Sequence, residues 1–214
     1  AKDINTFKKI GFTILNKKDK TKNSFKDFVI AEDILELANS DIINLFNNYI
    51  NNSFPEIKKI RLSKHNKDVI ADNFRILQGG EIVENVIPWI LKNKPKISPE
   101  INNRIEMAIK ITKDEINQAV KFRENLKKEI ELTLPEGLIA LFPTTPFSSP
   151  KCGQSDEQLS SYRKKLMEFT SIAGMTSRPQ ISIPKFKDNT GPIGISLLGW
   201  QYSDEVLLEK LTYL

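Results

Sequence analysis

Apolar positions along the chain follow two periods, one typical of strands and one typical of helices. Short apolar runs at residues 25–30, 57–62 and 138–142 predict strands. The third run is continuously apolar, which is typical of a strand buried on both faces. Two further runs, at 180–184 and 193–197, alternate with a period of two and flank turn-forming residues. This pair predicts an antiparallel hairpin.

Helices are predicted between the strands. Cap residues followed by apolar side chains at helical spacing predict starts near Ser40, Ser98, Thr112, Ser155 and Ser203. Residues 67–92 predict another helix, with a break at Gly79-Gly80 and a kink or restart at Pro88. The helix after Ser155 is expected to bury Leu159, Tyr162, Leu166 and Phe169. The pattern therefore predicts an α/β fold, a mixed β-sheet with helices on both faces.

Composition places the chain among globular proteins. It has 214 residues, 39% hydrophobic and 28% charged, which suits one domain or most of one. No run of 18 apolar residues predicts a transmembrane helix, and the first residues lack the apolar segment of a signal peptide. The single cysteine, Cys152, excludes an internal disulfide and favours a reducing cytoplasm.

Positive charge is concentrated at the start of the chain. Residues 1–26 carry eight lysines and two aspartates, a net charge of +6, against −1 for the remainder. We expect a Lys-rich polar leading segment exposed to solvent. The alternative is a nucleic-acid contact, but nucleic-acid readers more often interleave arginine with aromatic residues on one face. Binding that persists at high salt would count against that alternative.

Several motifs occur in an order that resembles the amidase-signature family. The C-terminal ones are residues 169–174, 179–184 and 191–199, a helix, a turn and the two strands of a hairpin. Earlier ones are residues 27–37, 74–78, 88–90, 98–104 and 141–146, several of them similar to amidases of the indoleacetamide type. The resemblance runs from about residue 8 onward. It implies that residues 1–214 are the C-terminal part of an amidase domain with an α/β/α fold.

The resemblance also implies a mechanism. Amide hydrolysis in this family uses a serine nucleophile, a second serine in a cis peptide and a neutral lysine, all carried by the N-terminal half. The Ser-bearing Gly-rich turn is not found here. Gly79-Gly80 is followed by Glu81, Ser148-Ser149 lacks flanking glycines, and Ser160-Ser161 lies within a helical pattern. We therefore expect no catalytic residue in this chain and a catalytic half that lies outside it.

Three residues are candidates for the wall of a substrate pocket. Thr144 and Thr145 follow a predicted buried strand, and ligands bind at strand ends in sheets of this type. Arg104 matches, in related glutamine amidotransferases, an arginine that binds a carboxylate; a surface salt bridge is the other interpretation. Met167 stands where those amidotransferases have an aspartate, which argues against that branch. Ser177-Arg178 replaces the family's usual Gly-Leu.

No cofactor or metal is expected. His65 is the only histidine, and neither it nor Cys152 lies in a cluster of metal ligands. The expected partners are the N-terminal half of the amidase and a small-molecule amide. A homodimer or an aggregation-prone monomer is a further expectation, because a sheet that continues into absent strands exposes an edge. Two alternatives remain, a non-catalytic remnant or binding module, and a fragment like the amidase-type component of a glutamine amidotransferase.

Overall fold

The computed structural model describes residues 1, 3–15, 24–188 and 191–213. Its strands form one mixed sheet in the order β2-β1-β3-β5-β4. The strands are β1 (Asp27–Ala31), β2 (Lys58–Ile60), β3 (Leu138–Pro143), β4 (Gln180–Lys187) and β5 (Pro192–Leu198). β1 runs parallel to both β2 and β3, whereas β5 is antiparallel to β3 and β4. The predicted strands and hairpin are confirmed.

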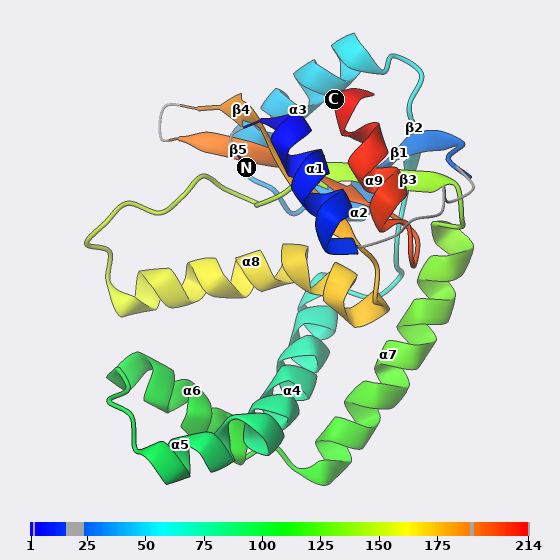
Figure 1. The fold of residues 1–214 in the computed structure, drawn as a ribbon. Coiled ribbons are helices and arrows are strands. Elements are labelled where there is room, and N and C mark those ends of the chain that lie inside the picture. Colours follow the sequence, from blue (N-terminus) through cyan, green and yellow to red (C-terminus); the bar gives the residue numbers. More distant parts are fainter. Residues whose placement is uncertain (2, 16–23, 189–190, 214) are drawn as a thin grey trace.

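The described residues also form the following helices: α1 (Ile4–Leu15), α2 (Glu32–Leu35), α3 (Ser40–Ser53), α4 (Lys67–Asn85), α5 (Ile87–Asn93), α6 (Pro99–Ile109), α7 (Lys113–Thr133), α8 (Asp156–Thr176) and α9 (Asp204–Lys210). A short 3-10 helix, η1 (Leu211–Tyr213), ends the described chain. One face of the sheet is covered by α4, α7 and α8, and the other by α3 and α9 (Figure 1). The predicted α/β fold with helices on both faces is confirmed.

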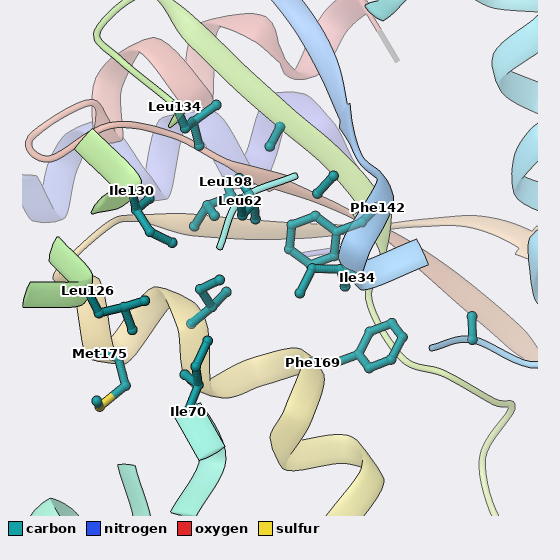
Figure 2. Packing of buried hydrophobic residues seen from close by; sticks show 14 of the residues in the cluster. Ile34, Leu62, Ile70, Leu126, Ile130, Leu134, Phe142, Phe169, Met175 and Leu198 are labelled. Carbon is teal, nitrogen blue, oxygen red and sulfur yellow. The ribbon is translucent and has the colours of Figure 1, made fainter. Parts of the chain in front are cut away.

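Alternating side chains of β1 divide the core into two layers. Val29 and Ala31 pack toward α4, α7 and α8, while Phe28 and Ile30 pack toward α3 and α9. Figure 2 shows the first layer, where Phe142 of β3 lies near Ile34 and above the helices. Its other labelled members are Leu62, Ile70, Leu126, Ile130, Leu134, Phe169, Met175 and Leu198. The continuous apolar run of β3 is buried because both layers cover it.

Helix starts agree closely with the cap signals. Thr112 and Ser155 each form a capping box, in which the hydroxyl accepts from the third main-chain N–H of the helix and that residue's side chain bonds back. Ser98 accepts a hydrogen bond from the main chain of Ile101. The cap of α3 is Asn39, one residue earlier than predicted.

The break in the 67–92 helix lies near Pro88 and not at the glycines. α4 continues through Gly79 and Gly80 and ends at Asn85, and α5 restarts with proline in its first turn. A Cβ on Gly79 would lie 2.3 Å from the side chain of Ile111, so the glycine permits α4 to pack closely on the next helices. The predicted break at Gly79-Gly80 is therefore wrong, and the restart at Pro88 is confirmed.

Burial along α8 was predicted only in part. Phe169 is buried, but Leu159, Tyr162 and Leu166 are half-buried, because the first half of α8 extends beyond the sheet (Figure 1).

Near the other end of the chain, residues 4–15 of the leading segment form α1, which the sequence did not predict. Gly11 faces Leu208 of α9 in that contact. The lysines at 17–22 lie outside the described residues.

Arg178 joins three parts of the fold. Its buried guanidinium donates to the carbonyl oxygen of Leu134 at 3.0 Å and to that of Gly199 at 3.1 Å. It also lies 3.3 Å from the carboxylate of Glu131. Burial lowers the pKa of Arg178, and Glu131 opposes that shift. The preceding residue, Ser177, has a φ of 55°, the left-handed conformation that favours glycine.

Candidate functional site

A chain of polar side chains crosses the sheet at the end of β3. Gln180 Nε2 donates to Ser196 Oγ at 2.8 Å, and Ser196 Oγ donates to Thr144 Oγ1 at 3.0 Å. Thr144 Oγ1 and Ser182 Oγ are 2.7 Å apart. We call these four residues the hydroxyl chain. Thr144 directly follows β3, which places the hydroxyl chain at the carboxyl end of a parallel strand, where ligands bind in sheets of this type.

The first two hydrogen bonds of the hydroxyl chain have a defined direction. An amide nitrogen can only donate, so Ser196 accepts from Gln180 and gives its single proton to Thr144. Between Thr144 and Ser182 either hydroxyl group can donate, because each has one proton and two acceptor lone pairs. Ser182 lies at the end of the hydroxyl chain and is exposed to solvent. Hydrogen bonds in a series polarise one another.

Gly194 makes the short contacts in the hydroxyl chain possible. A Cβ at this position would lie 2.6 Å from Ser182 Oγ and 2.7 Å from Thr144 Oγ1. The main-chain N–H of Thr144 also donates to the carbonyl oxygen of Gly194 at 2.8 Å. A side chain here would push the two hydroxyl groups apart, so Gly194 is needed for their positions.

Thr145 points into the loop after β3. Its hydroxyl donates to the carbonyl oxygen of Phe147 at 2.7 Å, and the ring of Phe147 meets that of Tyr162 edge-on at 4.6 Å. A hollow of about 270 Å³ lies between this loop and α8, lined by Asn39, Phe147, Gln158, Ser161, Tyr162 and Lys165. Thr145 thus shapes the loop that borders the hollow, and Thr144 belongs to the hydroxyl chain.

Arg104 lies apart from both threonines. It is on α6, its side chain is 53% exposed, and it lies 3.7 Å from Glu100 of the same helix. Glu100 also pairs with Arg163 of α8. The structure places Arg104 in an exposed ion pair, the other interpretation given above, and does not show it in the hydroxyl chain. Exposed pairs of this kind contribute little to stability.

Serine and lysine share a hollow at two places. In one, Ser63 Oγ donates to Glu129 at 3.1 Å, and the amine of Lys67 lies 2.6 Å from Asp33. In the other, Ser161 and Lys165 stand one turn apart on α8, and both side chains are exposed. A serine nucleophile needs a base within hydrogen-bond reach, and a lysine base is usually buried so that it loses its charge. In the first hollow Lys67 is buried, but its amine bonds to Asp33 and to the carbonyl oxygen of His65 and not to Ser63. In the second hollow Lys165 is exposed.

Metal ligands do not cluster in the part of the chain that the structure describes. Cys152 is exposed on a loop. His65 lies 3.4 Å from Glu129 and packs edge-on against Phe122 at 5.0 Å. Among residues 1, 3–15, 24–188 and 191–213, no helix is long and apolar enough to cross a membrane.

Sequence reasoning found Thr144 but missed its partners. The signal was present, because the period of two in the hairpin places Gln180 and Ser182 of β4 on the same face as Gly194 and Ser196 of β5. The opposite face carries the apolar residues of the same strands. The strand register brings the amide, the hydroxyl groups and the glycine together on one polar face.

Comparison with known proteins agrees with this architecture. Amidase 1 of Arabidopsis thaliana is 24% identical over 97% of this chain and 56% of its own length. The chloroplastic outer envelope protein 64 of the same plant is 22% identical over 99% of this chain and 41% of its own. A crystal structure of an amidase matches all of this chain and 50% of its own with a TM-score of 0.84, at 15% identity.

The chain thus spans about half the length of these relatives. The family model described as Amidase matches residues 8–208, which is nearly the whole chain. The match includes the strands, the hairpin and the hydroxyl chain described above. This protein belongs to the amidase family.

Proposed function

We propose that this chain is the C-terminal part of an amidase that hydrolyses the C–N bond of a small carboxylic amide. The nucleophilic serine, the serine of the cis peptide and the lysine base come from an N-terminal half that is not among residues 1–214. The observation that supports the proposal most strongly is the match to the family over residues 8–208, together with coverage of about half of its relatives. The serine and lysine pairs seen here lack the geometry of a nucleophile and base.

In this proposal the chain supplies part of the substrate pocket. Thr144 and Ser182 present polar groups at the end of β3, and Thr145 holds the bordering loop. Arg104 is exposed on α6 and pairs with Glu100, which also pairs with Arg163 of α8. In this proposal Arg104 would contact a ligand at that surface. The chemical step belongs to the other half, and this half orients the acyl group of the amide. No cofactor is part of the proposed reaction.

The edge strands of the sheet and an apolar surface of α1 could contact another part of the fold. β4 is eight residues long and lies at one end of the sheet, while β2 at the other end has three residues. Ile10 and Ile14 of α1 are 47% and 76% exposed. Unpaired edges and exposed apolar side chains favour association. We propose that the N-terminal half covers them, and that a homodimer forms when it is absent.

In two alternatives the chain takes no part in the hydrolysis of a small carboxylic amide. A remnant or binding module of the same fold would associate with no catalytic half. A fragment like the amidase-type component of a glutamine amidotransferase is favoured by one similarity. The matching component of the glutamyl-tRNA(Gln) amidotransferase of Thermotoga maritima is 30% identical over 41% of this chain and 18% of its own length. Met167, in place of an aspartate, argues against this branch.

A cytoplasmic location is part of the proposal. It is supported by the single, exposed cysteine, since a secreted protein more often forms disulfides. Two relatives are named for the chloroplast and mitochondrial outer envelopes, so fractionation of cells is the direct test. Recovery of the protein in an organelle envelope fraction would contradict this part.

Complementation tests the proposed function. The chain is mixed with the matching N-terminal half, and ammonia release from simple aryl and alkyl amides is measured. We expect hydrolysis by the mixture and none by either half. Ser182→Ala should raise KM more than it lowers kcat, whereas Ser149→Ala, a serine in the next loop, should change neither. Association of the two halves without hydrolysis would favour the non-catalytic alternative.

A further inference from the structure

A second polar hollow lies at the carboxyl ends of β1 and β2. Its volume is about 370 Å³. The hollow is bordered by the turn after β1, the loop between β2 and α4, the start of α4, and Glu168 of α8. The carboxyl ends of neighbouring parallel strands are where sheets of this type bind small molecules. Neither Arg104 nor the threonines at 144 and 145 line it, so it is separate from the pocket proposed above.

The floor of this polar hollow is a buried ion pair. The amine of Lys67 lies 2.6 Å from Asp33 Oδ2, and the two side chains are 5% and 3% exposed. The main-chain N–H groups of Leu62 and Ser63 donate to Asp33 at 3.0 and 3.1 Å, which fixes the carboxylate. Lys67 also donates to the carbonyl oxygen of His65 at 3.2 Å. Among the described residues, one of its three N–H donors is left for a ligand.

Both positively and negatively charged side chains line the polar hollow. Arg61 and Glu36 pair with each other at 2.9 Å and cancel. Lys64 adds a second ammonium group to the hollow. Asp68 and Glu168 add carboxylates at the start of α4 and on α8. Burial raises the pKa of Glu168 above its ordinary value, and the charge of Asp68 adds to the rise, whereas Lys164 and Lys165 oppose it.

A cation near the two carboxylates relieves their repulsion, and an anion near the two lysines accepts their spare hydrogen bonds. We propose that the polar hollow binds a small zwitterion, with the chemistry of a free α-amino acid. Its ammonium group lies against Asp68 and Glu168, and its carboxylate lies against Lys64 and Lys67. Among the described residues, Lys64, Asp68 and Glu168 form no ion pair within 4 Å, and Lys67 has one N–H beyond its bonds to Asp33 and His65. This site does not depend on the proposed amidase function.

Binding of glycine to this chain tests the proposal. Isothermal titration calorimetry and amide NMR shifts are measured with glycine, with glycinamide, which lacks the carboxylate, and with N-acetylglycine, which lacks the ammonium group. We expect saturable binding of glycine, with shifts at Ser63, Lys64 and Asp68. Each single-charge analogue should bind at least about tenfold more weakly, the effect of losing one charge-assisted hydrogen bond.

Two variants outside the buried pair test the residues. Lys64→Ala and Glu168→Gln should each weaken glycine binding at least about tenfold. Lys151→Ala and Glu209→Gln, which remove exposed charges elsewhere, should leave it unchanged. Far-UV circular dichroism of every variant should match the wild type, because none of these side chains is in the core. Absence of saturable glycine binding would overturn the proposal, as would equal binding of the three ligands or full binding by Lys64→Ala and Glu168→Gln.

Discussion

The guanidinium of Arg178 donates a hydrogen bond to the carbonyl oxygen of Leu134, the residue that caps the end of α7, across 44 positions of sequence. The same side chain bonds to Gly199 beyond β5. Two main-chain carbonyl oxygens in the interior thus depend on one charged group. Buried carbonyl oxygens need partners, so the contact between Arg178 and Leu134 fixes α7 against the end of the sheet.

Replacing Arg178 should destabilise the fold. Arg178→Leu leaves the carbonyl oxygens of Leu134 and Gly199 without this donor. We expect a loss of about 2–4 kcal/mol in the free energy of unfolding, measured by urea denaturation. Arg104→Leu is the matched control, because this arginine is exposed, and it should change the value by less than about 0.5 kcal/mol. Equal losses for the two variants would contradict the role given to Arg178.

Glycine in place of Ser177, in the turn before Arg178, should stabilise the fold. Ser177 has a φ of 55°, which costs energy for any residue with a Cβ. Ser177→Gly should therefore raise the free energy of unfolding by about 0.5–1 kcal/mol. Thr170→Gly, in the interior of α8, should lower it by about 1 kcal/mol. Thermal unfolding that ranks the two variants in the opposite order would show that this turn is not strained.

The pair between Lys67 and Asp33 should behave differently from an exposed pair. Lys67→Met leaves the buried carboxylate of Asp33 without its cation, and we expect a loss of about 3–5 kcal/mol. Lys59 pairs with Glu32 at 3.4 Å with side chains 55% and 35% exposed, so Lys59→Met should cost less than about 1 kcal/mol. Chemical denaturation of both variants measures the difference. Similar small losses would mean that the floor of the polar hollow is open to water.

Glu168 should make stability depend on pH. Its pKa in the folded chain is above the ordinary value of 4.5, mainly because burial disfavours its charge. The folded state therefore binds the proton more tightly than the unfolded state, and stability falls as pH rises from about 4.5 through the folded pKa. Glu168→Gln lacks this loss, so its melting temperature should exceed that of the wild type at neutral pH, with the gap closing in acid. A gap independent of pH would contradict the shift.

Local signals explain why much of the fold could be predicted. Ser98, Thr112 and Ser155 cap their helices through bonds to residues three positions away, so nearby sequence contains the whole interaction. The strands are recognisable from their periods for the same reason. The predicted helix break at Gly79 was wrong because this glycine serves close packing against Ile111. The local sequence does not reveal that contact.

The candidate site could be predicted only in part. Thr144 followed from its place after a buried strand. Its partners Ser182 and Ser196 are 38 and 52 positions away, and their contacts depend on the strand register that the structure shows. The pairing of Asp33 with Lys67 likewise depends on how α2 and the start of α4 meet at the end of the sheet. Long-range geometry, and not residue type, was the missing information.

The central claim is that the nucleophile of the amidase lies outside this chain. The most direct measurement is labelling of the mixed halves with a serine-reactive fluorophosphonate, followed by peptide mass spectrometry. We predict a labelled serine in the N-terminal half, and no label on this chain, Ser63 and Ser161 included. Stoichiometric label on a serine of this chain, with loss of amide hydrolysis, would contradict the account.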